Sequence, residues 1–185
     1  MQVDIPCAGT ITIEHSARAR RLIISVSHTA MRVRVPRGIP LEHGRVFALE
    51  RREWIRKHVE HCRARKQAQN ALMNTLPPIT DARLASHTII SRCRELSART
   101  GLSCSRITIR NQKTRWGSCS RKNTISLNIT LARLPRHLMD YVILHELLHT
   151  RIRGHGPEFW KALDSHVGDA RALRRELKRY APSMA

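Results

Sequence analysis

Aromatic and acidic side chains are scarce in this chain, and it has no long apolar run. Aromatic residues make up 4% of its 185 residues and hydrophobic residues 41%, so a core must be built mainly from aliphatic side chains. No segment approaches the roughly 20 apolar residues that a membrane-spanning helix needs, and the first residues lack a basic stretch followed by an apolar one. The pattern argues against a transmembrane helix and a secretory signal, and we expect a cytoplasmic protein.

The cysteines lack the pattern of a disulfide framework or of a cysteine zinc knuckle. There are five of them, an odd number, and no two form a C-x-x-C pair. The sequence therefore predicts reduced thiols at Cys7, Cys62, Cys93, Cys104 and Cys119.

Acidic residues are too few to balance the basic ones. The chain has 14 Asp and Glu against 34 Lys and Arg, a formal net charge of +20, which implies attraction to an anionic partner such as nucleic acid, acidic protein or a phospholipid surface. Many cations fall in residues 45–66, a basic helical surface that could contact nucleic acid. Such a run is also typical of a solvated helix face, and no helix-turn-helix or zinc-finger pattern accompanies it. The sequence does not indicate the oligomeric state.

The chain has the length of one domain, and we expect a single domain over residues 1–185. Alternating apolar and polar residues in 1–36 predict three short strands in an antiparallel meander. Residues 41–74 predict a basic helical segment that is broken in places. Two successive prolines separate it from a core at 81–181. Because strands and helices are both predicted, the expected fold class is α+β.

The predicted elements of the core begin and end at residues that suit these positions. Four residues favour the start of a helix: Asp81, Pro135, Pro157 and Asp169. Gly101 is placed to end the first of these helices. The alternating residues 125–130 predict a strand, in a hairpin whose turn lies at 121–124.

The segment HELLHTRIRGH at the end of the second helix concentrates residues that bind metals. His145 and His149 are four apart, so on a helix they lie on one face and can present two ring nitrogens to one ion. Glu146 lies about 100° round the helix from His145, where it can hold a water instead of acting as a ligand. His155 supplies the third protein ligand that a catalytic zinc needs.

His155 can reach such an ion only if the helix ends before it. A continuing helix would carry it some 9 Å further along the axis and onto another face. We expect Gly154 and Gly156 to end the helix and to let the chain turn back.

These residues predict a zinc-dependent hydrolase with one ion. Zinc acidifies its bound water and polarises a carbonyl, so Glu146 can take the water's proton and later pass it to the leaving amine. The sequence therefore predicts hydrolysis of amide bonds in a peptide or protein substrate. A chance match on a surface helix is the alternative for the motif, and Glu158, Asp164 and His166 are alternative third ligands.

Several segments, in this order and spacing, resemble the YgjP-like metallopeptidase family. They are KTRWGSCS at 113–120, ISLNITLARLP at 125–135, DYVILHELLH at 140–149 and HGPEFW at 155–160, with EHSARARRLIISVS and VRVPRGIP nearer the N-terminus. The resemblance implies a zincin-like core of a small antiparallel or mixed sheet, an active-site helix and a backing helix, with SprT-like proteases as relatives. It also implies His145, His149 and His155 as zinc ligands and Glu146 as the catalytic residue.

The sequence departs from the pattern of this family at two places. The middle of the chain, around 66–82, is shorter than usual, and TRIRGHG replaces the more typical residues before the third histidine. Metzincins share the histidine spacing but have a glycine where this chain has Ile152, so we rank that family lower.

Three further residues are candidates for contacts with substrate or transition state. Trp116 precedes a strand along which an extended substrate could add as a further strand, although filling the core is its more ordinary role. Arg115 could stabilise a developing oxyanion, and Tyr141 lies one helical turn before His145. The other functions left open are a nucleic-acid-associated protein with a structural zinc, a protease acting on DNA-bound proteins, and a zinc-binding pseudoenzyme.

Overall fold

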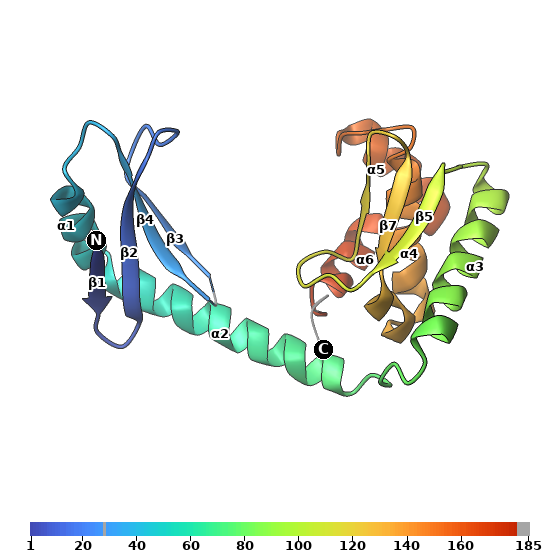
Figure 1. The fold of residues 1–185 in the computed structure, drawn as a ribbon, viewed down its shortest axis with the longest axis horizontal. Coiled ribbons are helices and arrows are strands. Elements are labelled where there is room, and N and C mark those ends of the chain that lie inside the picture. The colour runs from blue at the N-terminus through green and yellow to red at the C-terminus, as the bar shows by residue number, and fades with distance from the viewer. Residues whose placement is uncertain (28, 181–185) are drawn as a thin grey trace. The chain divides into compact units, whose positions relative to one another are not determined.

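A computed structural model describes residues 1–27 and 29–180 (Figure 1). The chain divides into two compact units, Met1–Ala68 and Gln69–Ala185. Within the described residues, no helix is long and apolar enough to cross a membrane. The single domain expected over 1–185 stays a prediction, and each unit is described by itself.

The N-terminal unit contains a four-stranded sheet and the helices that follow it. Its elements are β1 (Gln2–Ile5), β2 (Gly9–Ser16), β3 (Ile23–Val26), β4 (Met31–Pro36), α1 (Leu41–Glu50) and the first part of α2 (Arg52–Asn74). The strand order is β1-β2-β4-β3, and β2 runs parallel to β4. The predicted antiparallel meander is therefore wrong, because there are four strands and β3 lies at the edge of the sheet.

Burial of one sheet face explains the parallel pairing. In the register of β2 and β4, Ile11 lies opposite Met31 and Ile13 opposite Val33, and all four side chains are buried. The pairing places the two apolar alternations side by side on one face, which α1 covers. Gly44 lets α1 approach closely, since a Cβ there would lie 2.7 Å from side-chain carbons of Ile13 and Val35.

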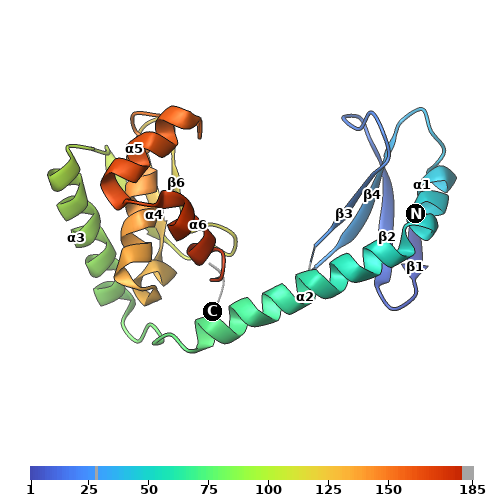
Figure 2. The same ribbon diagram turned by 180° about the vertical axis from the view of Figure 1, so that it is seen from behind.

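The C-terminal unit combines a small mixed sheet with four α-helices (Figure 2). Its elements are α3 (Ala82–Thr100), β5 (Arg106–Arg110), β6 (Gly117–Cys119), β7 (Thr124–Asn128), the 3-10 helix η1 (Ile129–Arg133), α4 (Arg136–Leu148), α5 (Pro157–Val167) and α6 (Ala170–Leu177). In the order β5-β7-β6, β5 is parallel and β6 antiparallel to β7. The α+β class is confirmed.

The capping interactions at the ends of these helices agree with the predictions. The Asp81 carboxylate accepts hydrogen bonds from the amides of Arg83 and Leu84, and Gly101 adopts a left-handed conformation with φ of 67°. Asp169 caps α6 through the amide of Ala172. Helices α4 and α5 begin directly at or after the predicted prolines.

Helix α4 is the central element of this unit, with α3 on one side and α5 and α6 on the other (Figures 1 and 2). Nine of its residues are buried, most of them in the core that α4 shares with the sheet. A bidentate ion pair joins it to α3, where the Arg92 guanidinium donates to both Asp140 oxygens at 2.6 Å. This packed helix carries His145 in its last turn and places His149 at its C-terminal end.

Candidate metal centre

Three imidazole rings converge at the C-terminal end of α4. The Nε2 atoms of His145 and His149 are 3.2 Å apart, those of His149 and His155 are 3.1 Å apart, and those of His145 and His155 are 3.0 Å apart. His145 lies in the last turn of α4, His149 directly follows the helix, and His155 precedes α5. Among the described residues, these three histidines form the one group of at least three possible metal ligands.

The spacing of these nitrogens fits a metal ion. A tetrahedral site with metal–nitrogen bonds of about 2.0–2.1 Å separates its donor atoms by about 3.3–3.4 Å, close to the separations found here. The Nδ1 of His149 donates to the Ile152 carbonyl oxygen at 2.9 Å, so its Nε2 keeps a free lone pair. The three rings therefore present nitrogens to a shared point, which is the donor set that a divalent cation requires.

Burial also favours the neutral, ligating form of His145 and His155. Burial, together with the neighbouring His149 and His155 and with Arg174, lowers the pKa of His145 from 6.5 to about 3. Burial likewise lowers the pKa of His155, with contributions from His149 and Arg174. Neutral imidazoles have the lone pair that binds a metal, so His145 and His155 need no deprotonation step near neutral pH.

Phe159 contacts all three imidazole rings. Its side chain is fully buried, and its ring centroid lies 4.9 Å from His145, 4.6 Å from His149 and 4.8 Å from His155. Phe159 belongs to the hydrophobic core of this unit. Its contacts restrict the orientations of all three imidazole rings.

The reason why His155 returns to the site differs from the one predicted. Helix α4 ends at Leu148, well before Gly154, and a turn follows in which Ile152 N–H donates to the Leu148 carbonyl. Among the described residues, the glycines with positive φ do not include Gly154 or Gly156. The expected role of these glycines as helix breakers is therefore wrong for the end of α4.

Contacts from other elements hold the loop that carries His155. The Arg153 guanidinium donates to the carbonyl oxygens of Ser120 at 2.7 Å and Arg121 at 3.2 Å, and to the Asn123 side chain. The indole Nε1 of Trp160 donates to the His155 carbonyl oxygen at 2.9 Å. The turn between β6 and β7 and the first turn of α5 thus position the third histidine.

Glu146 directly follows His145 on α4 and packs against β6. It is 7% exposed, and a Cβ on Gly117 would lie 2.7 Å from its Cγ and 2.9 Å from its Oε1. The absence of a side chain at Gly117 therefore creates the space that Glu146 occupies. No pattern in the sequence indicates this contact, apart from the WGS segment itself.

Burial raises the pKa of Glu146 from its ordinary value of 4.5 to about 7. The folded metal-free protein therefore binds this proton more tightly than the unfolded chain, and ionising Glu146 costs stability as the pH rises from 4.5 to about 7. We expect metal-free Glu146→Gln to be more stable than wild type above pH 7, by on the order of a few kcal/mol. Below pH 4.5 the two proteins should be alike, because Glu146 is protonated in both states.

Urea unfolding of chelator-treated protein at several pH values measures this difference. The histidines titrate in both proteins, so their contribution cancels in the comparison. A stability difference that stays constant across pH would contradict the raised pKa of Glu146.

Of the other candidate residues, Tyr141 lies near the histidine cluster. Tyr141 is buried, and its ring centroid is 5.9 Å from that of His145. Trp116 is half-buried against the core, and the carbonyl of the exposed Arg115 accepts a hydrogen bond from Asn128 at 2.8 Å. Their suggested roles toward substrate stay predictions.

The alternative third ligands do not join the cluster. Glu158 and His166 are exposed, and the Asp164 carboxylate accepts from the Ala170 amide at 2.9 Å. Among the residues that the structure describes, His155 therefore provides the third nitrogen.

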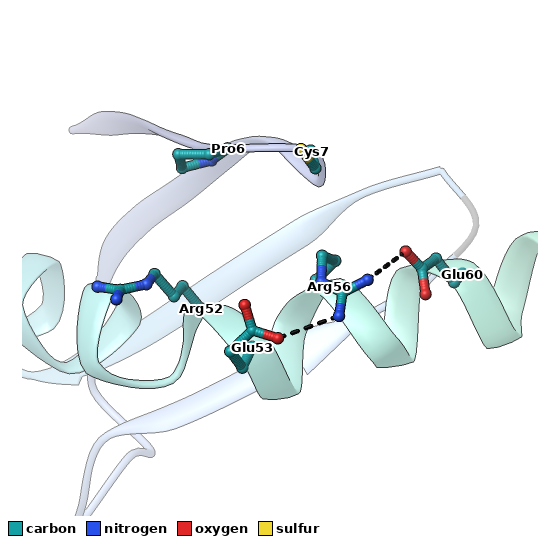
Figure 3. A pocket seen from close by; sticks show the side chains of 6 residues that line it. All are labelled: Pro6, Cys7, Arg52, Glu53, Arg56 and Glu60. Carbon is teal, nitrogen blue, oxygen red and sulfur yellow. Dashed lines mark hydrogen bonds and ion pairs between the residues drawn. The ribbon is translucent and has the colours of Figure 1, made fainter.

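The basic helical segment of the N-terminal unit borders a cavity of about 530 Å³, between α2 and the turn at Pro6 and Cys7 (Figure 3). Within it, Arg56 pairs with Glu60 at 2.9 Å and with Glu53 at 3.1 Å. Part of the basic run is thus neutralised by the helix's own carboxylates. Contact of this surface with nucleic acid stays a prediction.

Comparisons with known proteins identify a family for residues 66–180. No match is found among curated proteins. Two solved structures are similar with a TM-score of 0.43: the metallopeptidase zymogen of Pyrococcus abyssi abylysin, 22% identical over 49% of this chain and 93% of that one, and the metallopeptidase zymogen of Methanocaldococcus jannaschii jannalysin, 25% identical over 48% and 92%. The family model for the YgjP-like metallopeptidase domain matches residues 66–180, more than half of the chain. The chain therefore belongs to the YgjP-like metallopeptidase family.

Proposed function

We propose that this protein is a zinc-dependent peptidase of the HExxH-x5-H type, in which His145, His149 and His155 hold one ion and Glu146 moves the proton. The convergence of the three Nε2 atoms within 3.2 Å of one another supports this proposal most directly. Imidazole nitrogens also suit other transition metals, and zinc is the choice that a tetrahedral set of three histidines favours. The cytoplasmic location stays a prediction.

The chemistry of amide hydrolysis requires an electrophile and a base at one place. When bound, a divalent cation acts as a Lewis acid that polarises the scissile carbonyl and acidifies water. The Glu146 carboxylate accepts a proton from the attacking water and then delivers it to the nitrogen of the leaving amine. Its raised pKa, near 7, suits a group that must both accept and release this proton.

The edge strand β6 offers a place for the substrate backbone. In the order β5-β7-β6, only one side of β6 is paired among the described strands. An extended peptide could add to its other side through main-chain hydrogen bonds. Because Glu146 packs against Gly117 of this strand, a peptide so bound would pass close to the carboxylate.

Metal analysis combined with a peptidase assay tests the proposal. We expect about one zinc per chain in the purified protein, and hydrolysis of a fluorogenic peptide library that a chelator abolishes and added zinc restores. His149→Ala should lose both the ion and the activity, because two imidazoles alone bind zinc weakly. Turnover that is unaffected by metal removal would refute the proposal.

The alternative is a nucleic-acid-associated protein in which zinc is only structural. The net charge of +20 favours an anionic partner, as it would for a protease that acts on DNA-bound proteins. A structural site, however, has no use for a buried carboxylate beside the ligands. Bound metal without hydrolysis of any peptide would favour this alternative or a pseudoenzyme.

A further inference from the structure

A cationic cavity lies beside the histidine cluster, on the side of α6. Its volume is about 260 Å³, and its lining consists of Trp160, Arg171, Arg174, Arg175 and Lys178. The four cations follow helical spacing at i, i+3, i+4 and i+7, so they share one face of α6 and the residue after it. Helix α6 packs against both α4 and α5, between which the chain carries His149 and His155 (Figure 2).

Among the described residues, the positive charge that lines this cavity has no acidic partner. No acidic residue contributes to its lining, and none of these four cations forms an ion pair with another described residue. Some arginines elsewhere are paired, such as Arg92 with Asp140 and Arg56 with two glutamates. Glu176, on α6 itself, contacts His137 at 2.9 Å. Like charges gathered in a hollow repel one another and favour binding of an anion.

Trp160 connects this cavity to the candidate metal centre. The Arg174 guanidinium carbon lies 5.3 Å from the centroid of the Trp160 ring, and that ring lies 6.1 Å from the His155 ring. The guanidinium is therefore within about 11 Å of the His155 ring, a distance that an extended peptide covers in about three residues at 3.3–3.6 Å each. A side chain close to the scissile bond can reach the cavity.

We propose that this cavity binds an acidic side chain of the substrate, within three residues of the bond that is cleaved. The inference rests on the proposed peptidase function and adds a substrate class to it. An Asp or Glu carboxylate can accept paired hydrogen bonds from a guanidinium, while its methylene groups contact the Trp160 ring. A hollow of about 260 Å³ suits a single side chain, whereas a nucleic-acid backbone is recognised along an extended open groove.

Pairs of fluorogenic peptides that differ only by Glu or Gln test the proposal. The substituted position is scanned over three residues on each side of the cleaved bond, and kcat/KM is measured with the zinc-loaded full chain. We expect wild type to prefer Glu at one position by about 10- to 100-fold. In the double variant Arg171→Gln, Arg175→Gln this ratio should fall toward one, and Arg175→Glu should favour a Lys peptide at the same position.

Arg179→Gln is the matched control. Arg179 is an exposed cation directly after Lys178 but does not line the cavity, so the Glu to Gln ratio should stay at the wild-type value. Equal cleavage of the two peptides at every position would overturn this inference while leaving the peptidase function intact. Failure to cleave any peptide would overturn both.

A nucleic-acid ligand gives a different result. If the double variant loses affinity for a fluorescent single-stranded DNA while the peptide ratio is unaffected, then the cations of α6 bind phosphates, and the acidic-substrate proposal is wrong.

Discussion

Replacing Glu146 by glutamine is expected to lower kcat by about 10²- to 10⁴-fold while the protein keeps its metal. Glutamine has nearly the same shape as glutamate and can fill the same space beside Gly117, so the fold and the three histidines should be unaffected. It cannot accept a proton from water near neutral pH, however. Steady-state hydrolysis of a cleaved peptide, with the zinc content of the same sample, measures both parts of the prediction.

Glu158→Gln is the control for this experiment. Glu158 is an exposed carboxylate in the first turn of α5, near the site in sequence but outside the histidine cluster. Its loss should leave turnover within about twofold of wild type, as expected for a surface change. If Glu146→Gln retained wild-type turnover, Glu146 would not be the base.

Adding a single methyl group at Gly117 should lower kcat by about 100-fold. In Gly117→Ala, the new Cβ would lie 2.7 Å from the Cγ of Glu146, a distance that real Cβ atoms essentially never show. Glu146 is buried and cannot move freely aside, so its carboxylate must shift, and a misplacement of about 1 Å at a catalytic group can cost about 10²-fold in rate. The histidines come from other positions, so zinc binding should remain.

Gly154→Ala separates this effect from the general loss of a glycine. A Cβ on Gly154 meets nothing within 4 Å, and its φ is not positive, so alanine should be tolerated there. Zinc content and kcat of the two variants are to be measured side by side. Equal losses in both variants would mean that the contact between Gly117 and Glu146 is not the cause.

The close contacts behind these predictions could not have been read from the sequence. Gly117 and Glu146 are far apart along the chain and meet only because β6 packs against α4. The same holds for the ion pair of Arg92 and Asp140, since α3 and α4 are separated by the whole sheet in sequence. Such contacts depend on how elements pack, and a pattern within one segment carries no information about them.

The N-terminal sheet shows a similar limit. The alternation in residues 1–36 indicated strands, because side chains alternate along any strand, but it indicated three where the structure has four. It did not indicate which strand pairs with which. That choice followed from burying the apolar faces of β2 and β4 together under α1.

The sequence by itself determined the features that depend on a few neighbouring residues. The caps at Asp81 and Asp169, the hairpin turn before β7, and the shared face of His145 and His149 all follow from local hydrogen bonding and helical geometry. Only the tertiary structure decided how His155 reaches the other two rings. Arg153 ties its loop to the β6–β7 turn, Trp160 donates to the His155 carbonyl, and Phe159 packs against the His155 ring. Long-range packing alone brings these residues together.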